Sequence, residues 1–249
     1  FNATHQKVLK ALQQVDYLSS KYHVVIANPP YMGSKGMNGR LKVFADKNYP
    51  DSKSDLFAMF IERGFDLIVQ RGFNAMVTMQ NWMFLSSFQE MREKMLVNKD
   101  ITTLIQIGYN SFPELNSKVA QACAFVFKNC PALYEVGLYI NLNDAPQSAD
   151  KEQVFLRKKN STNVFHVKKT DFKKIPGSPI AYWVSESIRR VFAEGTVLKE
   201  IGDTRQGMAT SDNDRFLRLW SEVSFDRSCL KARSRTEAVE SGKKWFPYN

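Results

Sequence analysis

A short apolar run, Tyr22 to Ala27, ends at two consecutive prolines, and this junction constrains the fold more than any other feature of the chain. The run is β-branched and too short for a buried helix, so it predicts a buried strand. Proline has no backbone N–H to donate within a sheet, so the strand must stop before Pro29 and Pro30. Similar runs predict three further strands, at 73–79, 101–107 and 120–127.

Segments with apolar residues at helical spacing lie around these runs. The spacing predicts helices at about 5–18, from Ser52 or Ser54 to Gly72, from a capping box at Ser87–Glu90 to Val97, and at 182–194. Strands that alternate with helices predict an α/β domain with a largely parallel sheet, and the last two strands, which no helix separates, predict a hairpin at its edge. Residues 32–51 are rich in Gly, Lys and Asn and predict a long loop.

The composition is that of a globular protein and argues against several functional classes. Of 249 residues, 43% are hydrophobic and 24% are charged, which argues against general disorder. No apolar run approaches the ~20 residues that span a bilayer. Cys123, Cys130 and Cys229 form no C-x-x-C pair, and the histidines are scattered. We therefore expect neither a disulfide framework nor a metal centre, and a reducing cytoplasm fits the cysteine usage best.

Positive charge gathers in the second part of the chain. Residues 1–150 hold 15 Lys/Arg and 13 Asp/Glu, a net +2, whereas residues 151–249 hold 20 and 12, a net +8. This asymmetry predicts a catalytic module followed by a polyanion-binding module, with nucleic acid as the commonest polyanion; an ordinary basic surface is the alternative. We expect a catalytic domain at 1–145, a basic connector at 146–180 and the start of a second domain at 181–249.

The tetrapeptide Asn28-Pro29-Pro30-Tyr31 directly follows the first strand, where open α/β sheets bind their ligands. The Asn28 side-chain oxygen can accept a hydrogen bond from an amino group, and the fixed φ of Pro29 can aim its carbonyl at the same group. Tyr31 offers an aromatic face to a planar base. These residue types predict a site that grips the exocyclic amine of a nucleobase; a simple Pro-Pro turn that ends a strand is the structural alternative.

With this tetrapeptide the chain resembles the amino-methyltransferases that use S-adenosylmethionine. More specifically, it is similar to the adenine-specific DNA methyltransferases of BREX phage-defence systems, the PglX family, and to their type IIG restriction-modification relatives. The resemblance rests on YHVVIANPPYMG at 22–33, KSDLFAMFIE at 53–62, MVTMQNWMFLSS at 76–87 and GMATSDNDRF at 207–216. His23 departs from the family, which usually has Asp there, but this position lies outside the catalytic tetrapeptide.

The resemblance implies a fold, a reaction and partners. The fold would be the C-terminal part of a Rossmann-like class I methyltransferase sheet, followed by the start of a target-recognition domain. The intact protein would methylate N6 of a flipped adenine in double-stranded DNA, with Asn28, Pro29, Pro30 and Tyr31 as the catalytic residues. Other defence-system proteins are further expected partners, and no membrane is involved.

Two further groups of residues are candidates for DNA contacts. The family places a second aromatic residue against the flipped base, and Phe112 fits that position; an ordinary core role is the alternative. Basic residues of the connector and second domain could follow phosphates, or they could form a solvated face. They are Lys158, Lys159, Lys168, Lys169, Lys173, Lys174, Arg205 and Arg215.

The S-adenosylmethionine motif of such enzymes, a Gly-rich loop after a strand with an acidic residue further on, is not found here. Gly33, Gly36 and Gly39 follow the catalytic tetrapeptide instead. We expect the cofactor motif upstream of Phe1, and therefore little or no activity from this chain in isolation.

Three other functions remain open at this stage. The same tetrapeptide serves protein glutamine methyltransferases, although those enzymes lack a large basic recognition region after the sheet. A non-catalytic module that binds DNA is a second alternative, and N4-cytosine methylation is a third. Methyl acceptance by DNA or by protein separates the two enzymes.

Overall fold

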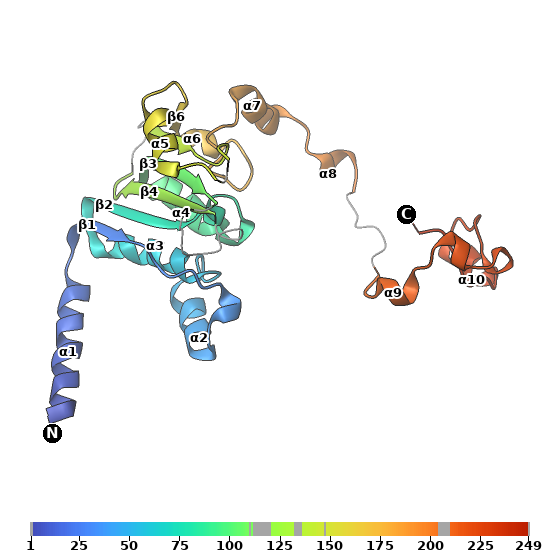
Figure 1. The fold of residues 1–249 in the computed structure, drawn as a ribbon, viewed down its shortest axis with the longest axis horizontal. Helices are drawn as coiled ribbons and strands as arrows, with labels where there is room; N and C mark the ends of the chain where they lie inside the picture. Colours follow the sequence, from blue (N-terminus) through green and yellow to red (C-terminus); the bar gives the residue numbers. More distant parts are fainter. Residues whose placement is uncertain are drawn as a thin grey trace. The chain divides into compact units, whose positions relative to one another are not determined.

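The computed structural model describes residues 2–109, 111, 121–131, 136–146, 148–203 and 210–248. These residues form two compact units, one up to Gly195 and one from Thr196 onward, and Figure 1 shows the elements of each. Phe112 and Arg205 lie outside the described residues, as does the start of the 207–216 segment.

The first unit is built on one sheet, with strands in the order β1-β2-β4-β3-β5-β6. The β1/β2 and β3/β5 pairs are parallel, and the other three pairs are antiparallel. Four strands, β1, β2, β3 and β5, therefore share one direction. The bounds are β1 (Tyr22–Ala27), β2 (Ile68–Met79), β3 (Asp100–Gly108), β4 (Ala122–Lys128), β5 (Val136–Asn141) and β6 (Val164–Lys168).

The predicted α/β class and the four predicted strands are confirmed. The prediction of a largely parallel sheet is wrong, because three of the five strand pairs are antiparallel. The β3–β4 hairpin exists, yet it does not lie at the edge, because β4 pairs with both β2 and β3. Apolar residues fill both faces of β4, and Cys123, Phe125 and Phe127 are buried. Such a strand is suited to the interior of a sheet.

Helices cover the sheet of the first unit and extend from it. They are α1 (Asn2–Ser19), α2 (Gly39–Asn48), α3 (Leu56–Leu67), α4 (Gln89–Asn98), α5 (Lys151–Lys159), α6 (Lys169–Phe172) and α7 (Glu186–Glu194). Short 3-10 turns lie at η1 (Ser34–Gly36), η2 (Gln80–Met83) and η3 (Ser86–Phe88). The main core joins α3 and α4 to the sheet through large aromatic side chains, among them Trp82, Phe57 and Phe127.

Four helix predictions need correction. The helix expected to run to Gly72 ends at Leu67, and β2 begins at Ile68. The expected loop at 32–51 contains α2, because Ala45 packs with Met37 and with Met59 of α3 in a small core of its own. The capping box at Ser87–Glu90 is absent: Phe88 is the N-cap of α4 and makes no side-chain cap bond. The last helix starts at Glu186 with Ser185 as its cap.

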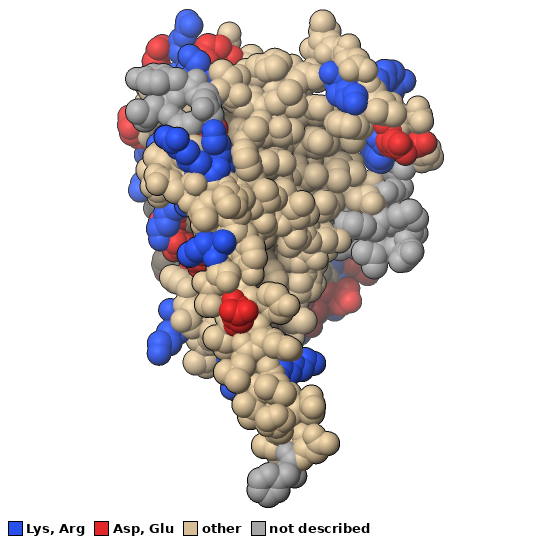
Figure 2. All heavy atoms as spheres, turned by 90° about the vertical axis from the view of Figure 1, so that its left-hand side faces the viewer, with Lys and Arg blue, Asp and Glu red and all other residues tan. Residues whose placement is uncertain are grey.

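Helix α1 is confirmed, but its apolar side chains do not pack on the rest of the described chain. None of its residues is buried, and on the outer edge strand β1 the Ile26 side chain is 80% exposed. Figure 2 faces this side of the molecule and shows a largely uncharged surface in its upper centre, with most charged side chains at the margins.

The segment expected to be a connector, 146–180, instead adds to the sheet. Helix α5 packs through Val154 on Ile140 and Leu142, and β6 pairs with β5 along the edge. The compact unit therefore runs past residue 145 to Gly195. The apolar residues that lie among the lysines hold this segment on the sheet, because packing there removes them from water.

The second unit consists of short elements: α8 (Leu198–Ile201), α9 (Asn213–Phe216), η4 (Trp220–Glu222), η5 (Phe225–Arg227) and α10 (Arg235–Glu240). The described part of this unit has no buried residue, and Trp220 is 88% exposed. Cys229 N–H donates to the Trp245 carbonyl at 2.9 Å and joins two of its loops. Across the described parts of the chain, no helix combines the length and the apolar character needed to cross a membrane.

Candidate active site

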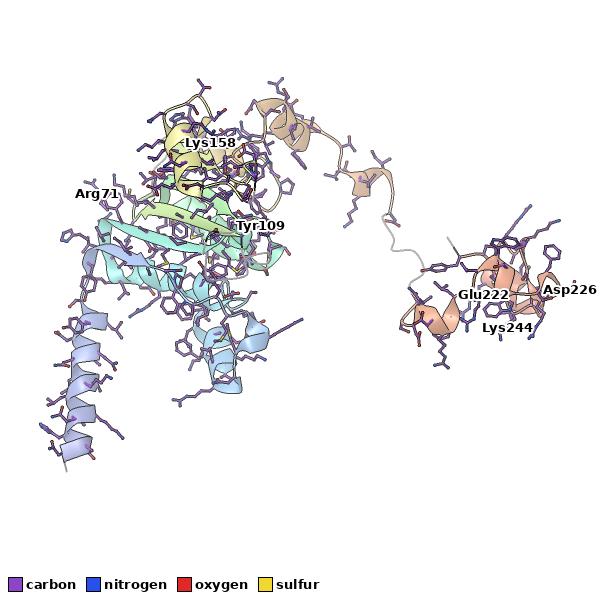
Figure 3. The ribbon with its side chains drawn as sticks, viewed as in Figure 1. Arg71, Tyr109, Lys158, Glu222, Asp226 and Lys244 are labelled. Carbon is purple, nitrogen blue, oxygen red and sulfur yellow. The ribbon has the colours of Figure 1, made fainter. Side chains whose placement is uncertain are left out.

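The candidate site lies at the end of the sheet where the four parallel-directed strands finish. Asn28 follows β1, Gln80 follows β2 and Tyr109 follows β3. Figure 3 labels Tyr109 at this end of the sheet and Arg71 at the other end. The position is the one that ligands take in open α/β sheets.

In the tetrapeptide the Asn28 amide is open to solvent, while the residues beside it pack against the protein. Asn28 is exposed, Pro29 is buried and Tyr31 is partly buried. The Tyr31 hydroxyl lies 3.3 Å from Asn28 Oδ1 and 3.3 Å from the Val77 carbonyl oxygen of β2. The hydroxyl has one proton for these two acceptors, and Asn28 Oδ1 keeps a lone pair for another donor. The Asn28 amide is thereby oriented while it stays accessible.

The Tyr31 ring is held from one side by the core. It meets the buried ring of Phe57 edge-on, with centroids 6.1 Å apart and an interplanar angle of 86°. Phe57 belongs to α3, so the helix that follows the tetrapeptide also sets the position of its aromatic ring. This edge-to-face arrangement is a favourable geometry for an aromatic pair.

Asp55 holds the chain directly after the tetrapeptide. Its Oδ1 accepts from Met32 N–H at 3.0 Å and from Phe57 N–H at 3.3 Å, and Leu56 N–H donates to the Met32 carbonyl at 3.0 Å. Burial raises the pKa of the Asp55 carboxyl, and its backbone hydrogen bonds oppose that shift. Asp55 is the N-cap of α3, and its side chain accepts a hydrogen bond from the first turn of that helix.

Burial raises the pKa of the Tyr31 phenol to about 12, with a smaller contribution from Cys123, so the folded chain holds a proton that the unfolded chain releases from about pH 10. Stability from this group is fully present below pH 10 and is lost as the pH rises through 12. We expect Tyr31→Phe to flatten the fall in the free energy of unfolding across this range, as measured by urea titration. The exposed Tyr17→Phe should keep the wild-type slope. An unchanged slope in Tyr31→Phe would contradict the expectation.

A cluster of side-chain amides at the same end of the sheet escaped the sequence analysis. Gln106 Nε2 donates to Gln80 Oε1 at 3.2 Å, and Asn143 Nδ2 donates to the same oxygen at 3.3 Å. Gln80 also donates to Gln121, and the buried Tyr182 hydroxyl donates to Gln106 Oε1. These residues come from five separated segments, so no spacing in the sequence could have brought them together.

Next to this cluster, Asn81 Oδ1 is buried and has no hydrogen-bond partner among the described residues. An acceptor left in this state costs free energy unless another donor reaches it. The residue directly follows Gln80, and the MQNW run was visible in the sequence as part of a family resemblance, without a role.

The six predicted DNA-binding lysines do not form one free basic surface. Lys158, labelled in Figure 3, donates to the Asn141 carbonyl at 2.7 Å and pairs with Asp144. Lys169 is buried, and Lys174 pairs with Asp171 at 3.0 Å and with Glu186 at 2.9 Å. Lys159, Lys168 and Lys173 are exposed. Arg215, in α9 of the second unit, lies over the ring of Phe216 at 5.2 Å.

The glycines that follow the tetrapeptide do not form a cradle for S-adenosylmethionine. A cradle needs glycines where the backbone approaches the ligand too closely for a side chain. Gly33, Gly36 and Gly39 each leave a Cβ at 3.3 Å or more from its neighbours, or in open space. Among the described residues no group of His, Cys, Asp and Glu could hold a metal ion.

The comparisons with known proteins agree with the geometry. Residues 2–112 match the model of the Eco57I restriction-modification methylase family. The chain is 40% identical over 97% of its length to the adenine-specific methyltransferase BrxX of Escherichia coli O9:H4 (strain HS), and 40% identical over 98% to the adenine-specific methyltransferase PglX of Lacticaseibacillus casei (strain Zhang). It spans 19% and 20% of the lengths of these relatives.

Among solved structures, the fold matches a chain from a study of complex assembly and conformational transition in the type I R-M system. The TM-score is 0.51 at 16% identity, over 75% of this chain and 42% of that one. At this identity the likeness concerns the fold, and it supports the predicted α/β class.

Proposed function

Because this chain belongs, over nearly its whole length, to the BrxX and PglX family of adenine-specific methyltransferases, we propose that it supplies the acceptor side of a DNA N6-adenine methyltransferase. The observation that carries the proposal is the exposed Asn28 at the tip of β1, with its Oδ1 oriented by the Tyr31 hydroxyl. The family match favours adenine in DNA over the side-chain amide of a protein glutamine.

The mechanism follows from what these residues can hold. An adenine that has rotated out of double-stranded DNA places its N6 amino group against Asn28 Oδ1 and the Pro29 carbonyl. Two acceptors fix both N–H bonds and leave the nitrogen lone pair pointing away from them. Fixing the direction of attack lowers the barrier, and the same acceptors stabilise positive charge that develops on the nitrogen. Tyr31 supports the base from its face.

The family match supports a proposal for the donor and the setting. We propose that S-adenosylmethionine would supply the methyl group, although Gly33, Gly36 and Gly39 do not form its cradle. DNA is the proposed partner, together with other proteins of a phage-defence system. A protein that acts on chromosomal DNA works in the cytoplasm, where we place it.

A chimera tests the proposal. This chain replaces the matching 244-residue stretch of the Escherichia coli BrxX relative, and transfer of labelled methyl groups is measured with plasmid DNA and with release-factor-like protein as acceptors. We expect methylation of DNA that appears as N6-methyladenine after digestion. Methyl transfer to protein alone, or N4-methylcytosine as the product, would contradict the proposal.

A further inference from the structure

The segment Gly33–Ser54, here called the α2 lobe, is a small structure of its own beside the tetrapeptide. Its two ends are clipped together, since Ser34 N–H donates to the Ser54 carbonyl at 3.0 Å and Gly33 bridges to Asp55. Inside it, Ala45 and Met37 pack with Met59 of α3. Figure 1 shows α2 below α3, on the side of that helix away from the sheet. The lobe is therefore fixed to the element that positions Tyr31.

A hollow of about 340 Å³ opens in the α2 lobe, and its rim is basic. Lys35, Lys42 and Lys53 line it, together with the hydroxyl-bearing Ser34 and Ser54. Lys53 is neutralised by Asp46, which also lines the hollow, at 2.9 Å. No carboxylate of the described residues lies within ion-pair distance of Lys35 or Lys42. The hollow therefore keeps two positive charges without a counter-charge in the described chain.

This combination of groups fits a phosphate ester. Two ammonium groups supply charge, and the serine hydroxyls supply hydrogen-bond donors. The hollow begins at Ser34, which is three residues after Tyr31. Three residues span at most about 11 Å of chain, so an anion held there lies close to a base stacked on Tyr31. A backbone phosphate of the same DNA strand is the anion that such proximity provides.

We propose that the α2 lobe binds a backbone phosphate of the DNA strand that carries the target adenine, in the hollow between Lys35 and Lys42. This inference rests on the proposed function, since it names a contact that holds the substrate of the same site. It also replaces the connector lysines as the predicted phosphate contact nearest to the chemistry, because Lys158, Lys169 and Lys174 are engaged within the fold.

The test compares two double variants with the same loss of charge. Lys35→Ala/Lys42→Ala removes the free charges of the hollow, and Lys7→Ala/Lys10→Ala removes two exposed lysines of α1. The 249-residue chain is titrated onto a duplex with one adenine opposite an abasic site, at several salt concentrations, by fluorescence anisotropy. Losing one phosphate contact should make the negative slope of log affinity against log salt shallower by about 0.9. It should also weaken the affinity roughly tenfold at 0.1 M salt.

The control variant Lys7→Ala/Lys10→Ala should keep the wild-type slope of log affinity against log salt, apart from the small change that its lower net charge causes. Equal slopes in wild type and Lys35→Ala/Lys42→Ala would overturn the subsite, as would the absence of measurable binding by the wild-type chain. Both lysine pairs are exposed, so we expect all variants to unfold at the same temperature, which circular dichroism checks.

A chemical substitution then identifies the phosphate. A neutral methylphosphonate is placed in turn at each of the two phosphates on either side of the adenine. At one position the wild type should lose about as much affinity as the lysine variant does, and the lysine variant should lose no more, because both changes remove the same contact. Additive losses at every position would overturn the proposal.

The chimera separates failure of the subsite from failure of the function. Methyl transfer that persists in Lys35→Ala/Lys42→Ala with unchanged salt dependence rejects the subsite alone. A wild-type chimera that methylates no DNA rejects the proposed function, whatever the lysines do.

Discussion

Asn28→Ala in the chimera should lower kcat for adenine methylation by about 10²- to 10³-fold, the range seen when one preorganised polar group is removed from an active site. The change removes the acceptor that fixes one N–H bond of the amine, so the lone pair loses its direction and the developing charge loses a partner. Asn28 is exposed and its side chain makes a long 3.3 Å hydrogen bond with the Tyr31 hydroxyl, so folding should not suffer. Single-turnover kinetics with saturating DNA measure the effect.

The matched variant is Asn28→Asp, which keeps an acceptor oxygen at the same position and should retain more activity than Asn28→Ala. DNA affinity of the 249-residue chain should stay within about twofold for both, because phosphate contacts supply most of the binding. If Asn28→Ala kept kcat within tenfold of wild type, the tetrapeptide would be only a turn that ends a strand.

Replacing Arg92 with methionine should destabilise the first unit by about 3–5 kcal/mol, because several buried carbonyls lose their donor and each unsatisfied group costs about 1–3 kcal/mol. Arg92 is 1% exposed, and its guanidinium donates to the carbonyls of Trp82 at 2.8 Å, Leu85 at 3.0 Å and Ser178 at 3.0 Å, and also to Gly177. Methionine fills similar space but leaves these buried acceptors without a donor. Urea unfolding followed by tryptophan fluorescence measures the loss.

The control is Arg190→Met on α7, an exposed arginine that should change the free energy of unfolding by less than about 0.5 kcal/mol. Arg92→Lys keeps the charge but cannot reach all these carbonyls from one ammonium group, so it should fall between the two. A loss of less than about 1 kcal/mol in Arg92→Met would show that the loops are held by other contacts. Burial lowers the pKa of the Arg92 guanidinium, with Glu93 opposing the shift.

Arg92 also connects stability to the site. It binds the loop from Trp82 to Leu85, which follows the tip of β2, to the distant loop at Gly177–Ser178. The Ile180 N–H, just beyond, donates to the Met83 carbonyl at 2.9 Å. One side chain therefore ties the segment after the basic region to the end of the sheet where Asn28 lies.

Local pattern was enough where a feature depends on neighbouring residues. The β-branched run before Pro29 predicted the strand β1, and alternating strands and helices predicted the α/β class; both are confirmed. The prediction that β1 is buried is wrong, because β1 is an edge strand with no buried residue. The α2 helix was missed because its Gly- and Lys-rich sequence hides the spacing of Leu41, Ala45 and Tyr49, which pack only when α3 is present.

Charge was the least reliable guide. Six lysines close together in the sequence suggested one basic surface, yet Lys158, Lys169 and Lys174 hold carbonyls and carboxylates within the unit. Whether a lysine is free for a phosphate depends on acceptors that other segments bring to it. The strand β6 likewise belongs to the sheet because of Val164 and Val167, which lie among those lysines.

The amino-acid sequence by itself indicated the family, the strand that ends at Asn28 and the chemistry proposed for this tetrapeptide, because each depends on residues adjacent in the chain. Tertiary structure alone decided the order of the strands, the amide cluster around Gln80, the buried Arg92 and the basic hollow of the α2 lobe. These features join segments far apart in sequence, and only burial against a common core brings their polar groups within hydrogen-bonding distance.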